Sequence, residues 1–134
     1  MNVYSVGPEQ VFRAVADAYA NNDADGVLSH FADDARIIGS LRHETWGDKT
    51  DWSDYLRREL EDFSVLEHRL ASADFGGLES VATSESLAIF SQEVGLKGKV
   101  RGRQFAHDGR WTCVLRDEGG DWKIVFSQFS LSLT

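Results

Sequence analysis

The C-terminal part of the chain places strand-forming residues on both sides of one glycine turn. Trp, Thr, Cys, Val and Leu precede Glu118-Gly119-Gly120, and Trp, Ile, Val and Phe follow it. Aromatic and β-branched residues around a short glycine loop are typical of a β-hairpin. The sequence therefore predicts a long hairpin with strands over Arg110 to Asp117 and Asp121 to Thr134. A chain that ends in this way needs further strands to pair with and a layer to cover the sheet.

Three helices are predicted ahead of that sheet. Pro8 suits a first helical turn, and apolar residues at helical spacing follow it over Glu9 to Asn21. Asp23 or Asp25 is placed to cap a short second helix. A third helix is predicted from about Thr50 to Phe63, because one face gathers Trp52, Tyr55, Leu56, Leu60 and Phe63.

The remaining strands are predicted from short apolar or alternating runs. They cover Arg36 to Ser40, Val65 to Phe75 and about Glu79 to Ser91. The segment from Gly95 to Arg103, with three glycines and four basic residues, favours a solvated turn or flared hairpin end. A lid or anion-contacting loop is the alternative. A turn at Asp108-Gly109 would move the start of the next strand.

The composition predicts one soluble domain over residues 1–134. The net charge of −8 disfavours nucleic acid as a partner, because phosphate backbones repel an acidic protein. No apolar stretch has the roughly 18 residues of a membrane span, and the first residues lack a signal-peptide pattern. We therefore expect a cytoplasmic protein. A single cysteine, Cys113, and the lack of a Cys/His cluster predict no intrachain disulfide and no structural metal, and we expect no cofactor.

Two groups of motifs resemble a known family. The first is YANNDADGVLSHFADDARI, from Tyr19 to Ile37, with Trp46-Gly47 ahead of the third helix. The second is RWTCVLRDEGGDWKIV followed by Ser127 and Ser130. In this order and spacing they resemble the SnoaL-like, or polyketide cyclase-like, branch of the nuclear transport factor two-like superfamily.

The resemblance implies an α+β fold, a cone-shaped α+β barrel with about three helices packed on the concave face of a curved, mainly antiparallel sheet. Members of this superfamily are commonly dimeric. Some are isomerases, dehydratases, cyclases or epoxide hydrolases, and others are non-catalytic association or transport modules. The fold alone therefore leaves the function open.

The catalytic groups of characterised relatives are not matched in this chain. Comparison with the ketosteroid isomerase pattern places Val15 at the tyrosine position and Gly39 at the base position. Where many members of the closest branch have His-x-His in the last strand, this chain has Phe126 and Gln128. Neither Val15 nor Gly39 carries a group that moves protons, which weakens the case for catalysis.

A few polar residues remain as weak catalytic candidates. Tyr19 lies one helical turn beyond Val15, His43 precedes the segment that leads to Trp46, and Arg36 lies on the first strand, where it would orient an anion. The pair Asp33-Asp34 resembles two catalytic carboxylates, but its expected place is the turn between helix and strand. There we expect it to cap backbone groups.

The two faces of the terminal hairpin predict two surfaces if side chains alternate regularly along each strand. One face would add Trp111, Phe126 and Gln128 to a pocket. The predicted pocket lining is Tyr19, Trp46, Tyr55, Trp111, Phe126 and Gln128. The other face is apolar where a solvated face would be polar, which predicts a homodimer packed sheet to sheet. Its predicted interface is Val114, Val125, Phe129 and Leu131.

Three functions follow from these observations. The leading hypothesis is a domain that binds a small apolar or aromatic ligand in a central cone-shaped pocket. The first alternative is an isomerase, cyclase or dehydratase that uses acid–base chemistry in that pocket. The second is a non-catalytic association module. Convergence of two titratable groups in the cavity would distinguish an enzyme from the other two.

Overall fold

The computed structural model describes residues 7–39, 43–70, 79–83, 86–100 and 102–131. Its helices are α1 (Pro8–Ala20), α2 (Ala24–Leu28) and α3 (Lys49–Asp62), close to the three predicted helices. The predicted cap of the second helix is confirmed for Asp23, whose carboxylate accepts a hydrogen bond from Gly26 N at 2.9 Å. None of the helices in the described part of the chain has the length and apolarity that crossing a membrane requires.

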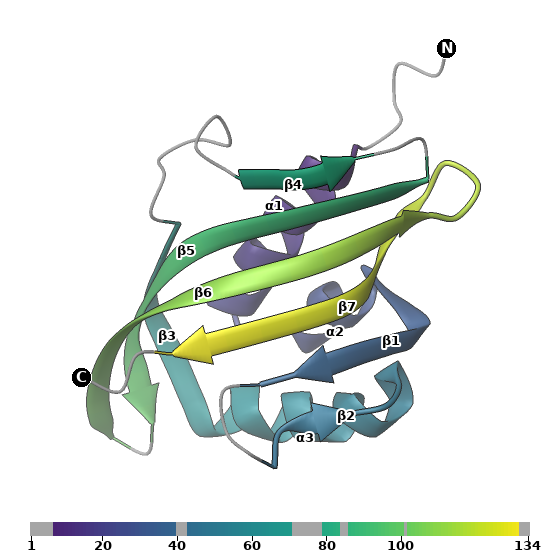
Figure 1. Ribbon diagram of the computed structural model, residues 1–134. Helices are drawn as coiled ribbons and strands as arrows, with labels where there is room; N and C mark the ends of the chain where they lie inside the picture. Colours follow the sequence, from purple (N-terminus) through teal and green to yellow (C-terminus); the bar gives the residue numbers. More distant parts are fainter. Residues whose placement is uncertain (1–6, 40–42, 71–78, 84–85, 101, 132–134) are drawn as a thin grey trace.

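In the part of the chain that the structure describes, seven strands form one sheet in the order β2-β1-β7-β6-β5-β3, with β4 pairing beside β3 on the same side of β5. β1 runs parallel to β7, and the other strand pairs among the described residues are antiparallel. The helices lie on one side of the sheet (Figure 1). This confirms the predicted α+β fold with helices on one face of a mainly antiparallel sheet. The strands are β1 Phe31–Ile38, β2 Thr45–Trp46, β3 Phe63–Leu70, β4 Glu79–Thr83, β5 Leu87–Val100, β6 Arg103–Asp117 and β7 Trp122–Leu131.

Several strand boundaries differ from the prediction. β1 begins at Phe31 rather than Arg36, and the segment predicted as one strand from Glu79 is divided between β4 and β5. The prediction of a turn at Asp108-Gly109 is wrong, because both residues continue β6 and pair with β5. β5 continues to Val100, which pairs with Arg103 at the start of β6, so the glycine-rich basic segment lies at the end of this hairpin.

The core lies between the helices and the inner face of the sheet. Phe12 of α1 is fully buried and stacks on Trp111 of β6, with ring centroids 4.0 Å apart. It also meets the edge of Phe90 on β5, at 6.1 Å. Offset and edge-to-face ring contacts stabilise a core beyond the burial of area alone. These contacts fix the position of α1, and with it the position of Tyr19 at the end of that helix.

A β-bulge in the last strand changes which face its residues occupy. Phe126 lies opposite Val114, whereas Ile124 lies opposite Leu115, so Val125 is the additional residue in β7. Beyond the bulge, Ser127 lies opposite Cys113 on the inner face. Directly opposed residues of antiparallel strands share a face, so the alternation predicted through β7 is wrong.

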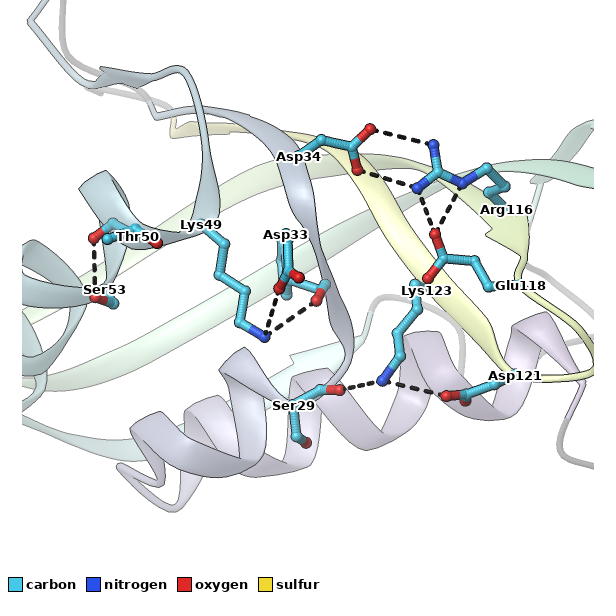
Figure 2. Close-up of polar contacts among 11 residues, drawn as sticks. Ser29, Asp33, Asp34, Lys49, Thr50, Ser53, Arg116, Glu118, Asp121 and Lys123 are labelled. Atoms are coloured by element: carbon cyan, nitrogen blue, oxygen red, sulfur yellow. Dashed lines mark hydrogen bonds and ion pairs between the residues drawn. The ribbon is translucent and has the colours of Figure 1, made fainter.

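Exposed ion pairs join β1 to neighbouring elements at one end of the sheet (Figure 2). Asp34 accepts two hydrogen bonds from Arg116, at 3.0 and 3.3 Å, and Arg116 also contacts Glu118. Asp33 lies 3.9 Å from Lys49 Nζ. These contacts agree with the expected structural use of both aspartates. Both lie within β1 and pair with cations of β6 and α3, however, rather than capping a turn before the strand.

Candidate functional site

Two tyrosines and two glutamates from three parts of the chain meet beside α3. The Tyr19 hydroxyl donates to Glu59 Oε1 at 2.6 Å, and the Tyr55 hydroxyl donates to Glu44 Oε2 at 2.6 Å. Tyr55 and Glu59 lie one helical turn apart on α3, so the two pairs adjoin. We call Tyr19, Glu44, Tyr55 and Glu59 the Tyr–Glu cluster.

Local structure brings these four side chains together. Tyr55 and Glu59 are four residues apart on α3, so they lie on the same face of that helix. Tyr19 lies in the last turn of α1, and Glu44 directly precedes β2. The Glu44 side chain is 8% exposed, and Tyr19, Tyr55 and Glu59 are half-buried. Burying carboxyl groups is costly unless they are hydrogen-bonded, as both are here.

Gly39 allows Glu44 to take its place in the cluster. The Gly39 N–H donates to the Glu44 carbonyl oxygen at 2.7 Å, which closes the connection between β1 and β2. A Cβ atom at position 39 would lie 2.7 Å from Glu44 Cβ and 2.8 Å from Glu44 Oε1. The position that the ketosteroid isomerase comparison leaves without a side chain is therefore filled by a carboxylate from across the turn.

The environment of the cluster raises the pKa values of three of its four side chains. Burial raises the pKa of Glu59, and the nearby Glu44 charge raises it further, while the hydroxyls of Tyr19 and Tyr55 lower it. Burial and the adjacent carboxylates raise the pKa of Tyr19 and of Tyr55, so both hydroxyls remain donors at neutral pH. Carboxyl and hydroxyl groups with shifted pKa values that meet in one place are typical of functional sites.

An aromatic surface adjoins the polar groups. The rings of Trp46 and Tyr55 are 4.6 Å apart with an angle of 45° between their planes. Both side chains are half-buried and pack against the core. The site thus combines ring faces with hydroxyl and carboxyl groups.

The structure brings together three of the six predicted lining residues, namely Tyr19, Trp46 and Tyr55. Trp111 is buried instead in the core, where its indole N–H donates to Ser127 Oγ at 2.9 Å. The predicted grouping with Phe126 and Gln128 is wrong, because the bulge turns both toward the outer face. There they lie opposite Val114 and Thr112.

The two other weak catalytic candidates do not join the cluster. Arg36 is exposed on β1 opposite Phe126, which lies on the outer face. His43 is exposed although it neighbours Glu44 in sequence. Of the three candidates, Tyr19 contacts the other titratable groups.

The predicted interface residues also separate. Val114 is half-buried on the outer face, beside Phe126 on β7 and Ile89 on β5. Phe129 lies opposite Trp111 and packs against the core, so its assignment to the outer face is wrong. Val125 lies at the bulge, and the side chain of Leu131 is outside the described residues.

Sequence reasoning missed both glutamates. Glu59 carried a usable signal, because it follows Tyr55 by four residues and Leu56 by three within the apolar stripe of α3. A glutamate at such a position is directed toward the core and needs a partner there. Glu44 carried no comparable signal, because its close approach to Gly39 depends on how β1 pairs with β2.

The match to a family model agrees with the fold. Residues 9–134 match the model of the SnoaL-like domain. The chain belongs to the SnoaL-like family. Among proteins with curated functions, none matches this SnoaL-like chain in sequence.

Solved structures of similar fold cover nearly the whole chain. A ketosteroid isomerase-like protein from Erwinia carotovora atroseptica has a TM-score of 0.82 at 16% identity, with 100% of both chains covered. A nuclear transport factor two-like protein from Cytophaga hutchinsonii has a TM-score of 0.75 at 16% identity, covering 98% of this chain and 100% of that one. At such identities the likeness shows the fold, and the function must be argued from the site.

Proposed function

We propose that this SnoaL-like domain binds a small, neutral aromatic molecule against Trp46 and Tyr55, with the polar substituent of the molecule on the Tyr–Glu cluster. The observation that carries the proposal is the convergence of two carboxyl groups and two hydroxyls beside a half-buried aromatic pair. Such polar groups within apolar surroundings are costly to folding, and a ligand that bonds to them gives them a use.

The charge of the cluster selects the class of ligand. Glu44 and Glu59 are both carboxyl groups, and the whole chain carries a net charge of −8. An anion brought next to them would be repelled, and the repulsion is strong where water is largely excluded. A phenol, by contrast, offers a ring for Trp46 and a hydroxyl that donates to a carboxylate.

We expect phenol to stabilise the protein and benzoate, an anion of similar size, to have no effect. A ligand that binds only the folded state, at a concentration about 100 times its Kd, adds about 2.7 kcal/mol to the free energy of unfolding. This raises the thermal unfolding midpoint by several degrees. Thermal unfolding at neutral pH with each compound measures the difference. Stabilisation by benzoate would contradict the proposal. A lack of stabilisation by any of a range of phenols would contradict it as well.

The matched variants for that experiment are both on α3. Glu59→Gln keeps the shape of the side chain but removes its carboxyl group, and is expected to weaken phenol binding. Glu61→Gln makes the same change on an exposed residue two positions away and should leave binding unchanged.

An acid–base enzyme is the second candidate, and the same convergence favours it. Two neighbouring carboxyl groups, each hydrogen-bonded to a tyrosine hydroxyl, are the kind of groups that the proton-transfer reactions of an isomerase, cyclase or dehydratase require. Of the predicted catalytic candidates, Tyr19 fits this role, whereas Arg36 and His43 are exposed elsewhere.

A homodimer is proposed on the outer face of the sheet. Ile89, Val114 and Phe126 lie side by side on β5, β6 and β7, and the helices cover the opposite face (Figure 1). Apolar side chains in a row across three strands favour a second sheet as cover, and twofold pairing is the commonest closed assembly. If the domain is an association module, dimerisation through this surface is its main function.

Val114→Lys is expected to convert a dimer to a monomer of about 15 kDa, because it places a charge in the centre of that row. Size-exclusion chromatography with light scattering at micromolar concentration measures the mass. Gln10→Lys, on the exposed face of α1, is the control and should remain dimeric. A wild-type protein that is a clean monomer would contradict the assembly.

A further inference from the structure

The two Tyr–Glu pairs of the cluster differ in how closely the protein encloses each carboxyl group. Glu44 is 8% exposed, and its Oε2 accepts a hydrogen bond from the Tyr55 hydroxyl at 2.6 Å. Its Oε1 lies so close to the backbone of Gly39 that a Cβ atom there would come within 2.8 Å of it. The Glu44 carboxyl group is therefore enclosed on both sides, which leaves little room for a ligand atom.

The Glu59 carboxyl group is less enclosed. Glu59 is half-buried on α3, and its Oε1 accepts a hydrogen bond from the Tyr19 hydroxyl at 2.6 Å. A carboxylate can accept about four hydrogen bonds, so this bond leaves Glu59 able to accept another. Tyr55, whose ring packs against Trp46, lies one helical turn away on the same face of α3. A small molecule on those two rings therefore has Glu59 within reach of its polar substituent.

We propose that Glu59 accepts the hydrogen bond from the ligand hydroxyl and that Tyr19 positions the Glu59 carboxylate for it. Glu44 then acts on the ligand only through Tyr55, whose ring it holds by the hydroxyl. The Tyr19 bond fixes the orientation of the Glu59 carboxyl group and favours its ionised form, which is the stronger acceptor. The inference rests on the proposed ligand site and gives its two glutamates different roles.

The charge of Glu59 makes the affinity for the ligand depend on pH. Burial and the Glu44 charge raise the pKa of Glu59, while the hydroxyls of Tyr19 on α1 and Tyr55 on α3 lower it. A hydrogen bond to an ionised group contributes more than one to a neutral group, so phenol should bind at least about tenfold more tightly above this pKa than below it.

Two exposed ion pairs involve charges that α2 and β1 bring to α3. Asp25 of α2 pairs with Arg57 at 2.6 Å, and Asp33 of β1 lies 3.9 Å from Lys49 Nζ. The side chains of β3, which also packs against α3, lie outside the described residues. The resolved causes of the raised pKa of Glu59 lie within the cluster itself.

Phenol titrations of the full-length protein at about pH 4 to 8 test these roles, because phenols, like tyrosine, ionise only near pH 10. In the wild type we expect the affinity to rise with pH in one step. Glu59→Gln should show no step and bind at least about tenfold more weakly at the upper end of the range. Glu44→Gln still offers an oxygen to Tyr55, so it should keep the step, moved to lower pH because the neighbouring charge is gone. Glu61→Gln is the control and should match the wild type.

Tyr19→Phe separates positioning from packing, because it keeps the ring and removes the hydroxyl. Loss of the bond that favours ionised Glu59 should move the step to higher pH. An equal loss of affinity at every pH, with the step in place, would mean that Tyr19 is merely structural. Wild-type binding without a step, or a step that remains in Glu59→Gln, would overturn the role of Glu59 and leave the proposed function intact. No binding of phenol by the wild type at any pH would overturn both.

Discussion

Replacing Phe12 with alanine is expected to remove about 3–5 kcal/mol from the free energy of unfolding, which is a large part of the roughly 5–15 kcal/mol of a typical domain. Phe12 is fully buried and contacts two other rings, stacking on Trp111 and meeting the edge of Phe90. Truncation leaves a cavity between α1 and the sheet that the stiff rings around it fill poorly. Urea unfolding followed by tryptophan fluorescence measures the loss.

Leu87→Ala is the control for that experiment. Leu87 is 45% exposed on β5, so its truncation removes little buried area and should cost well under half as much. Equal losses for the two variants would mean that Phe12 does not anchor α1 to the sheet. Because Tyr19 lies on the same helix, loss of that anchor would also leave the position of the cluster unexplained.

The helices and the terminal hairpin were predictable because local patterns specify them. Pro8 and the apolar spacing after it locate α1, and Glu118-Gly119-Gly120 locates the last turn. In that turn Gly119 and Gly120 have positive φ angles of 73° and 95°, which glycine adopts without steric cost. The glycines therefore indicate a conformation that few other residues would allow.

The faces of β7 were not predictable from the same pattern. A bulge adds one residue and reverses the inward and outward positions beyond it, and Val125 is as suited to a regular strand as its neighbours. Phe126 and Phe129 consequently exchange their predicted surroundings. Regular alternation is a property of the paired strands, and the sequence of one strand does not contain its register.

The candidate site was predictable in part. Three aromatic residues of the predicted lining come together: Tyr19 and Tyr55 belong to the cluster, and Trp46 packs against Tyr55. The glutamates complete it through long-range contacts, since Tyr19 and Glu59 are 40 positions apart. Side-chain pairs at such separations depend on how α1 and α3 pack, which local spacing does not determine.

Gly39→Ala is expected to lower the affinity for phenol about tenfold or more while the chain remains folded. The added Cβ would meet Glu44 Cβ at 2.7 Å and Oε1 at 2.8 Å, so the carboxylate must leave its place beside Tyr55. Overpacking of this kind typically costs about 1–3 kcal/mol, which the domain tolerates. Gly47→Ala, beside Trp46, is the control, because a Cβ there has no neighbour within 4 Å.

The indole N–H resonances of the four tryptophans provide the most direct test, because these residues are spread over the fold. Phenol is titrated into the wild type, Gly39→Ala and Gly47→Ala, and the Trp46 resonance is followed. We predict a saturable shift at Trp46 in the wild type and in Gly47→Ala, and a shift that requires much more phenol in Gly39→Ala. Trp111, in the core, should remain in place throughout. A saturable response at Trp122 without one at Trp46, or equal binding by Gly39→Ala, would contradict a ligand site at the Tyr–Glu cluster.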